Sequence, residues 1–204
     1  MAVPETYQIS ASRFNQIPHI DDQSIPSISQ LLGIGEILVY HKANDRFGVH
    51  LLHRHFEIDN DTVMFGFVDG DKEYSKMTKL SDLDPQKLRP QCFLFDSNEG
   101  FVPYEYKYGD GQSEILPALL SEDLGKHFMV NNLQHLFAIE RLQPSASRAD
   151  APFCREYPAE AFATVRVPVE DGIQALDKDT AWVFRAGEDG QIITRTTCSW
   201  RAGC

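Results

Sequence analysis

Short apolar segments separated by compact polar turns recur along most of this 204-residue chain, and this pattern limits the fold more than any other feature. Runs rich in β-branched and aromatic residues are typical of strands, and glycine, asparagine and aspartate between them favour hairpin turns. The pattern predicts an α+β fold built on a mostly antiparallel sheet that can close into a barrel. We expect strands at residues 36–41, 46–58, 63–68, 92–95, 101–108, 136–142, 163–167, 181–185 and 191–200.

Helical periodicity is confined to three places in the sequence. Residues 29–32 fit a short helical turn, residues 81–88 fit a short capped helix, and apolar positions recur at helical spacing over residues 113–133. Pro117 and Gly125 divide that third segment into two short helices. No internal repeat is apparent in the sequence. We therefore expect a few short helices beside the sheet.

The N-terminal segment differs from the rest of the chain. It is polar, carries prolines at positions 4, 18 and 26, and has no clear period. We expect residues 1–27 to form an extended or partly disordered arm. The remaining length suits one substantial core, so we expect residues 28–204 to form a single α+β domain. Within it, residues 143–151 are rich in serine and proline and are expected to form a loop.

The charge of the chain argues against several classes of partner. Acidic residues number 30 against 19 basic ones, giving a net charge of -11, and no sustained basic stretch is present. We therefore expect no nucleic-acid partner and no membrane partner. The N-terminal residues lack the basic start and apolar core of a secretion signal, and no run approaches the ~20 apolar residues of a membrane helix. We expect a cytoplasmic protein with reduced cysteines.

Histidines gather in one short segment of the sequence. Residues 50–55 contain His50, His53 and His55, three of the chain's seven histidines. Imidazole is the commonest metal ligand and titrates near neutral pH, so this clustering favours metal binding or acid–base chemistry. The segment is the best candidate for a functional site.

Alternation along the predicted strand at residues 46–58 sorts these histidines by face. His53, His55 and Glu57 share the apolar face that we expect to look inward, whereas His50 falls on the opposite face. Alternate residues on one face lie ~7 Å apart, so two imidazoles can close on one ion. His53 and Glu57, at ~13 Å, cannot easily share one. The strand therefore predicts the pair of histidines as a metal-binding unit.

A carboxylate from a neighbouring strand would complete a metal site. If the loop at residues 42–45 joins two paired strands, Glu36 falls on the same face as His53, one diagonal step away. Two histidines and a carboxylate leave coordination positions open and suit catalytic zinc or non-haem iron. We predict a divalent metal, zinc or iron, bound by His53, His55 and Glu36. The catalytic candidates are His53, His55 and Glu57.

Other interpretations fit the same residues. Paired histidines on a half-buried strand are often hydrogen-bonded pocket residues without a metal, and they also serve metal-free acid–base catalysis. A fourth metal ligand could come from Cys198 or Tyr106. If the following hairpin closes around residues 59–62, His55 faces Gly66, which has no side chain and leaves room for a ligand.

Two resemblances bear on these expectations. The His53-x-His55 strand and the glycine-punctuated hairpins of residues 48–70 resemble the first motif of cupins, in which two histidines and a glutamate on adjacent strands hold a metal. The Leu-Leu-His-Arg-His-Phe string at residues 51–56 and the order of the flanking segments are similar to uncharacterised proteins of filamentous fungi. That similarity implies a setting in specialised metabolism.

Together these features predict a small-molecule enzyme with a divalent metal as cofactor and a pocket centred on His53 and His55. The reaction stays open between metal-assisted oxygen chemistry, hydrolysis and isomerisation. Two alternatives remain. One is a non-catalytic protein that binds a small molecule or a partner, and the other is a metal-free acid–base isomerase or cyclase.

Overall fold

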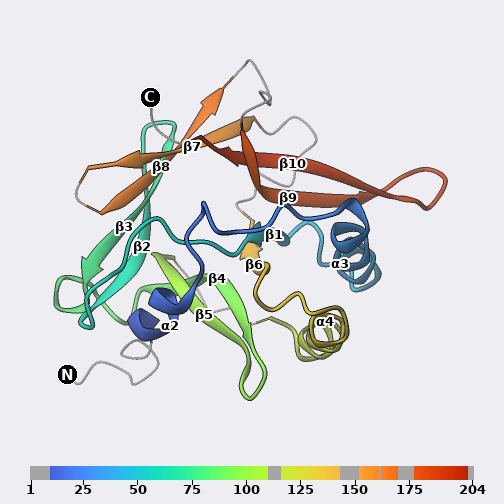
Figure 1. Ribbon diagram of the computed structural model, residues 1–204, viewed down its shortest axis with the longest axis horizontal. Helices are drawn as coiled ribbons and strands as arrows, with labels where there is room; N and C mark the ends of the chain where they lie inside the picture. Colours follow the sequence, from blue (N-terminus) through green and yellow to red (C-terminus); the bar gives the residue numbers. More distant parts are fainter. Residues whose placement is uncertain (1–9, 110–115, 143–151, 161, 170–176, 202–204) are drawn as a thin grey trace.

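The computed structural model describes residues 10–109, 116–142, 152–160, 162–169 and 177–201. Its strands are β1 (Phe47–Leu51), β2 (Thr62–Asp69), β3 (Lys72–Lys79), β4 (Leu88–Asp96), β5 (Gly100–Tyr108), β6 (Phe137–Arg141), β7 (Phe153–Ala159), β8 (Ala163–Val169), β9 (Lys178–Ala186) and β10 (Ile192–Trp200). They form a closed barrel in the order β1-β6-β4-β5-β2-β3-β8-β7-β10-β9 (Figure 1). Neighbours run antiparallel except for β2–β5 and β7–β10, which are parallel.

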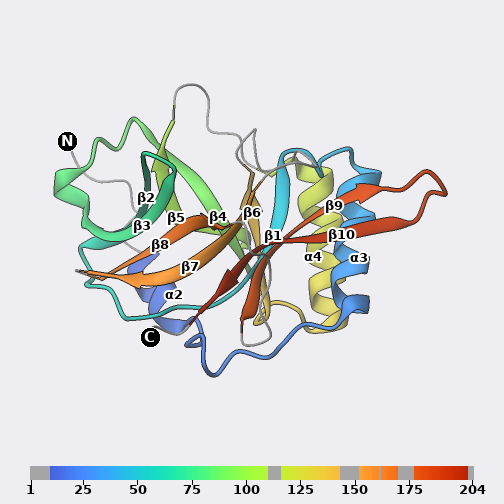
Figure 2. The same ribbon diagram turned by 90° about the horizontal axis from the view of Figure 1, so that it is seen from above.

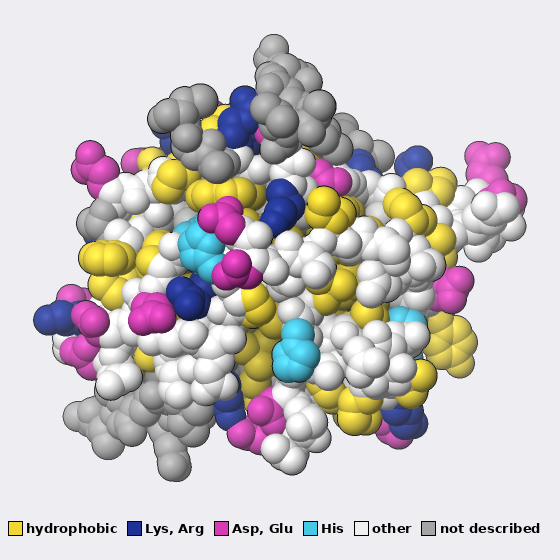
Figure 3. All heavy atoms as spheres, in the orientation of Figure 1, with side chains coloured by type: hydrophobic (Ala, Val, Ile, Leu, Met, Phe, Trp, Pro, Cys, Tyr) yellow, Lys and Arg dark blue, Asp and Glu magenta, His cyan; other side chains and the backbone are white. Residues whose placement is uncertain are grey.

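Helices cover the barrel at two places. The helices α3 (Ile28–Tyr40) and α4 (Ala118–Asn131) lie side by side against its outer face, whereas α2 (Ser10–Gln16) lies beside β2 and β5 (Figures 1 and 2). A short 3-10 helix, η1 (Leu80–Asp82), follows β3. None of the helices in the described ranges has the length and apolar character that a membrane crossing requires. On the face seen in Figure 3, acidic and basic side chains are interspersed.

The barrel consists of two topologically equivalent halves, α3 with β1 to β5 and α4 with β6 to β10. If each strand is replaced by its counterpart in the other half, β1 by β6, β2 by β7 and so on, every strand keeps the same neighbours around the barrel. The exchange centres on the antiparallel β1–β6 pair, where Val49 lies opposite Ile139. Each helix is followed by a left-handed residue, Lys42 (φ 52°) in one half and Asn132 (φ 54°) in the other. The fold therefore contains an internal repeat that the sequence does not reveal.

Helix α3 replaces a turn and a strand that the sequence led us to expect. Ser27 and Gln30 form a capping box at its start, and Leu31, Ile34 and Leu38 recur at helical spacing on its buried face. Gly35 lets this face approach the sheet closely. Gly35 therefore serves helix packing, and the predicted strand at residues 36–41 was wrong.

The two helices decide which face of β1 looks into the barrel. Phe47, Val49 and Leu51 pack with buried residues of α3 and α4 in the main core. The intervening His50 therefore points into the barrel interior, where it lines a cavity. The apolar face of β1, expected to carry the pocket, instead packs against helices. The expected orientation of His50 was wrong for this reason.

Much of the expected sheet is present in the structure. The predicted strands between residues 63 and 108, those at residues 136–142 and 163–167, and the final hairpin are all formed, and the sheet closes into a barrel. The sheet is mixed, however, and it includes β3 and β7, which we did not expect. The largely polar sequence of β3 and its part-exposed positions weaken the apolar alternation.

The helical expectations need three corrections. The segment at residues 113–133 forms one helix from Ala118, because Pro117 lies at its N-cap and Gly125 packs inside it against Phe95. Residues 81–88 do not form a capped helix, because residues 81 and 82 end η1 and Leu88 begins β4. Residues 10–16 of the expected extended arm form α2. The expected loop at residues 143–151 lies outside the described residues.

Helix α2 closes part of the barrel. Its Ala11 and Phe14 are buried in a second apolar cluster with Met64 and Tyr104. This packing explains why residues 10–16 form a helix, since it buries apolar surface that the polar composition of residues 1–27 obscured.

Candidate metal centre in the barrel interior

The histidine segment leaves the sheet immediately after β1. Leu52 donates its backbone N–H to the carbonyl of Leu136 at 2.9 Å, and Arg54 donates to the carbonyl of Pro18 at 2.9 Å. Ile20 in turn donates to the carbonyl of Arg54 at 3.0 Å. These bonds hold the segment between β6 and the N-terminal chain. Strand alternation therefore stops at Leu51, and the side chains beyond it follow the path of the loop.

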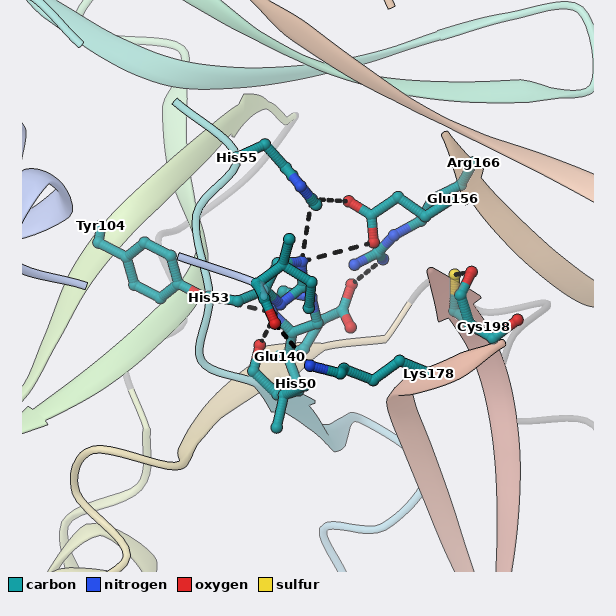
Figure 4. A network of polar contacts seen from close by, with 12 residues as sticks. His50, His53, His55, Tyr104, Glu140, Glu156, Arg166, Lys178 and Cys198 are labelled. Atoms are coloured by element: carbon teal, nitrogen blue, oxygen red, sulfur yellow. Dashed lines mark hydrogen bonds and ion pairs between the residues drawn. The ribbon is translucent and has the colours of Figure 1, made fainter. Parts of the chain in front are cut away.

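His53 and His55 converge with Glu156 of β7 (Figure 4). The Nε2 atoms of the two imidazoles lie 3.1 Å apart. Glu156 places Oε1 3.3 Å from His55 Nε2 and Oε2 3.8 Å from His53 Nε2. His50 joins this group, since His50, His53 and Glu156 each offer a ligand atom within 4.8 Å of the others. Four side chains from two halves of the barrel thus meet at one point.

Neighbouring groups fix the rings in orientations that suit metal binding. His53 Nδ1 lies 2.7 Å from the carbonyl of Leu51. A carbonyl only accepts, so Nδ1 carries the proton and leaves Nε2 bare toward the cluster. His50 Nδ1 lies 3.3 Å from the Tyr104 hydroxyl. The His55 ring packs on Trp200, with ring centroids 3.8 Å apart.

Polar atoms within this cluster have unfilled bonding capacity. His50 Nε2 and Glu156 Oε2 are buried and have no hydrogen-bond partner among the described residues. Buried polar atoms are normally satisfied, so such atoms facing one another indicate a further ligand. In the tautomer in which His50 donates its Nδ1–H to the Tyr104 hydroxyl, His50 Nε2 offers a lone pair, as Glu156 Oε2 does, and a cation would satisfy both.

The electrostatic environment favours the protonation states that a metal requires. Burial lowers the pKa of His53 to about 4 and that of His50 well below its usual value. Burial alone would raise the pKa of Glu156, but the hydrogen bond with His55 and nearby positive charge outweigh it and lower that pKa. At neutral pH His50 and His53 are therefore neutral and Glu156 is ionised, as metal binding needs.

A cavity of about 440 Å³ extends from this cluster through the barrel interior. This volume falls in the range of sites for small organic molecules. Arg166 of β8 also lines it and forms an ion pair with Glu140 of β6, with 2.6 Å between Nη1 and Oε1. The remaining lining includes Phe14, Met64, Ser75 and Glu105. The cavity therefore combines an apolar part with several charged groups.

The structure brings together only some of the predicted site residues. His53 and His55 meet as expected, and Gly66 of β2 lines the same cavity as His55, although His55 lies outside the strands. Glu36 is exposed on α3, because the segment expected to be a strand is helical. Glu57 is exposed and pairs with Arg54 at 3.4 Å. The structure therefore does not group Glu36 or Glu57 with the two histidines as the strand register predicted.

The sequence analysis missed Glu156 and misjudged His50. Glu156 lies on an unexpected strand about a hundred residues beyond the histidines, and nothing in its local sequence marks it. The inward orientation of His50 could have been predicted only from knowledge of which face of β1 the helices cover. Of the suggested fourth ligands, Cys198 does not belong to the cluster of possible ligands found among the described residues. Tyr106 lines the cavity, and its hydroxyl donates to the carbonyl of Pro103 at 3.4 Å.

Comparisons with known proteins found no family model that matches the chain and no match among curated proteins or solved structures.

Proposed function

We propose that the protein is a metal-dependent enzyme that acts on a small molecule bound in the barrel cavity. The observation that carries this proposal is the convergence of the bare Nε2 of His53, the unpartnered Nε2 of His50 and the ionised carboxylate of Glu156 on the cavity wall. Ligands bound at about 2.1 Å to zinc or iron lie about 3.0–3.5 Å from one another. The separations of 3.1, 3.3 and 3.8 Å in the cluster are close to these values.

Two overlapping groups of side chains could hold the ion. His53 and Glu156 belong to both groups, His50 completes one of them, and His55 completes the other. When bound, a divalent zinc or iron ion would polarise a substrate oxygen or activate water. Tyr104 and the Leu51 carbonyl orient two of the imidazoles, and the ion pair of Arg166 with Glu140 borders the space left for substrate.

Metal titration of tag-free, chelator-treated protein tests this proposal. Calorimetry with Zn²⁺ and visible absorbance with Co²⁺ should give one ion per chain. His53→Ala and Glu156→Gln should each lower the affinity at least about 10–100-fold, the loss typical of perturbing even supporting residues of a metal site. His135→Ala is the matched control, because His135 is exposed and should leave affinity unchanged. Wild-type protein that binds neither ion, or His53→Ala that binds like wild type, would contradict the proposal.

One observation favours a second candidate, metal-free acid–base catalysis. His55 Nε2 lies between His53 Nε2 at 3.1 Å and Glu156 Oε1 at 3.3 Å, so a proton can pass along this chain of contacts. An isomerase or cyclase of this kind would keep its activity after chelation and lose it in His53→Ala. A non-catalytic binding protein would instead retain its ligand in both tests without converting it.

A further inference from the structure

Each half of the barrel contains one irregularity that directs a side chain into the interior. In the β4–β5 hairpin the register shifts around the pair Cys92 and Glu105, and in the β9–β10 hairpin it shifts around Ala181 and Cys198. These two pairs occupy equivalent places in the internal repeat. A β-bulge re-aims the side chain that it carries and is common beside active sites.

The two irregularities lead to different cavities. Glu105 lines the 440 Å³ cavity that contains the histidine cluster. Cys198 lines a smaller cavity of about 190 Å³, which shares Glu140 and Arg166 with the larger one. Only the bulge in the first half therefore presents an ionisable carboxyl group to the proposed substrate site.

The surroundings of Glu105 favour a group that can hold or release a proton. Burial raises the pKa of Glu105 to about 7, although the positive charge of Arg166 opposes the rise. Cys92 on β4 is its hydrogen-bond partner, and the charges of Glu140 on β6 and Glu156 on β7 raise its pKa further. Lys107, on the same strand, also lines the cavity. A carboxyl that titrates near neutral pH suits general acid–base work.

We propose that Glu105 is the group that exchanges a proton with the substrate, on a part of the cavity wall formed by β5 rather than by the histidine cluster. This assignment rests on the proposed function for the identity of the cavity as a substrate site. It separates two tasks, because a divalent ion held by the histidines and Glu156 would polarise an oxygen of the substrate while Glu105 gives or takes the proton. Such a division suits enolisation and isomerisation of a carbonyl compound. The carboxylate of Glu105 takes the α-proton, the electron pair of the broken C–H bond forms the C=C bond of the enolate, and the C=O π pair moves onto the oxygen. Return of the proton from Glu105 to another carbon completes an isomerisation.

Labelling with dicyclohexylcarbodiimide tests whether Glu105 is protonated and reachable from the cavity. This apolar reagent takes the proton of a neutral carboxyl group and adds to its oxygen, so ionised carboxylates react poorly. Peptide mapping by mass spectrometry of folded wild-type protein should find the adduct at Glu105, strongest near pH 6 and several-fold weaker by pH 8. Glu156 and the ion-paired Glu140 should stay unlabelled.

Two variants complete the test. Glu105→Gln should abolish the adduct while keeping wild-type metal affinity, and Glu73→Gln, which changes another carboxyl of the same cavity, should leave labelling at Glu105 unchanged. Labelling of Glu105 with no metal binding would overturn the metal proposal and leave Glu105 as a proton-exchanging group. Absence of the adduct in folded wild-type protein, or labelling independent of pH, would overturn the assignment of Glu105.

Discussion

Replacement of Glu105 by glutamine should change how the stability of the protein depends on pH. The folded protein raises the pKa of this carboxyl from its ordinary 4.5 to about 7, mainly through burial. A group with a raised pKa binds its proton more tightly in the folded state. Its contribution to stability is therefore complete below pH 4.5 and is lost as the pH rises through 7. Glutamine resembles the neutral carboxyl and does not titrate, so its contribution to stability does not fall as the pH rises.

The size of the effect follows from the two pKa values. A carboxyl whose pKa rises from 4.5 in the unfolded state to about 7 in the folded state lowers the protein's free energy of unfolding by up to about 3 kcal/mol between acidic pH and pH 8. The side chain is partly exposed to the cavity, so water there screens its charge. We therefore expect Glu105→Gln to be about 1–3 kcal/mol more stable than wild type at pH 8 and nearly equal to it at pH 5.

Urea denaturation of metal-free protein at several pH values measures this difference. The comparison with wild type removes the opposite contribution of His50 and His53, whose lowered pKa values make stability rise with pH. Glu188→Gln, an exposed substitution in the turn between β9 and β10, serves as the control and should track wild type. A difference between Glu105→Gln and wild type that stays constant from pH 5 to 8 would refute the argument.

Three further predictions concern the fold. Gly35→Ala should destabilise the protein by about 1–3 kcal/mol in thermal or urea unfolding, because the added Cβ would lie 2.5 Å from Phe184 Cδ1; equal stability would contradict the packing of α3. Phe14→Ala should cost about 3 kcal/mol and open the barrel to small apolar dyes, since Phe14 is 3% exposed; unchanged stability and dye binding would show that α2 does not close the interior. Two coexpressed fragments divided after Gly109 should copurify as one folded species, because β1–β6, β1–β9, β3–β8 and β4–β6 pair across the halves; independent fragments would contradict the interlocked barrel.

The candidate site shows what a strand pattern can predict and where it fails. The density of histidines drew attention to His53 and His55, which the structure brings together on the cavity wall, because ligand-type residues are informative whatever their backbone conformation. The predicted partners failed because they depended on register. Glu36 was placed by a strand that is a helix, and Glu57 by an alternation that ends at Leu51. A wrong element type or boundary changes every facing residue that follows from it.

The strands themselves were easier to predict than their partners. Cys92–Phe95 and Phe101–Tyr108 were recognised from local composition and a short turn, and they form one hairpin in the structure. Their partners across the barrel lie far away in the sequence, such as β6 beside β4. Such pairings depend on which apolar faces can be buried together, and local patterns do not contain that information.

The sequence by itself determined the β-rich composition of the fold, most of its strands and the segment in which ligand-type side chains gather. Only the tertiary structure decided that α3 and α4 cover the apolar face of β1 and so turn His50 inward. It also decided that barrel closure places Glu156 against His53 and His55. The physical reason is that local propensity acts over a few residues, whereas burial of apolar faces selects partners from the whole chain.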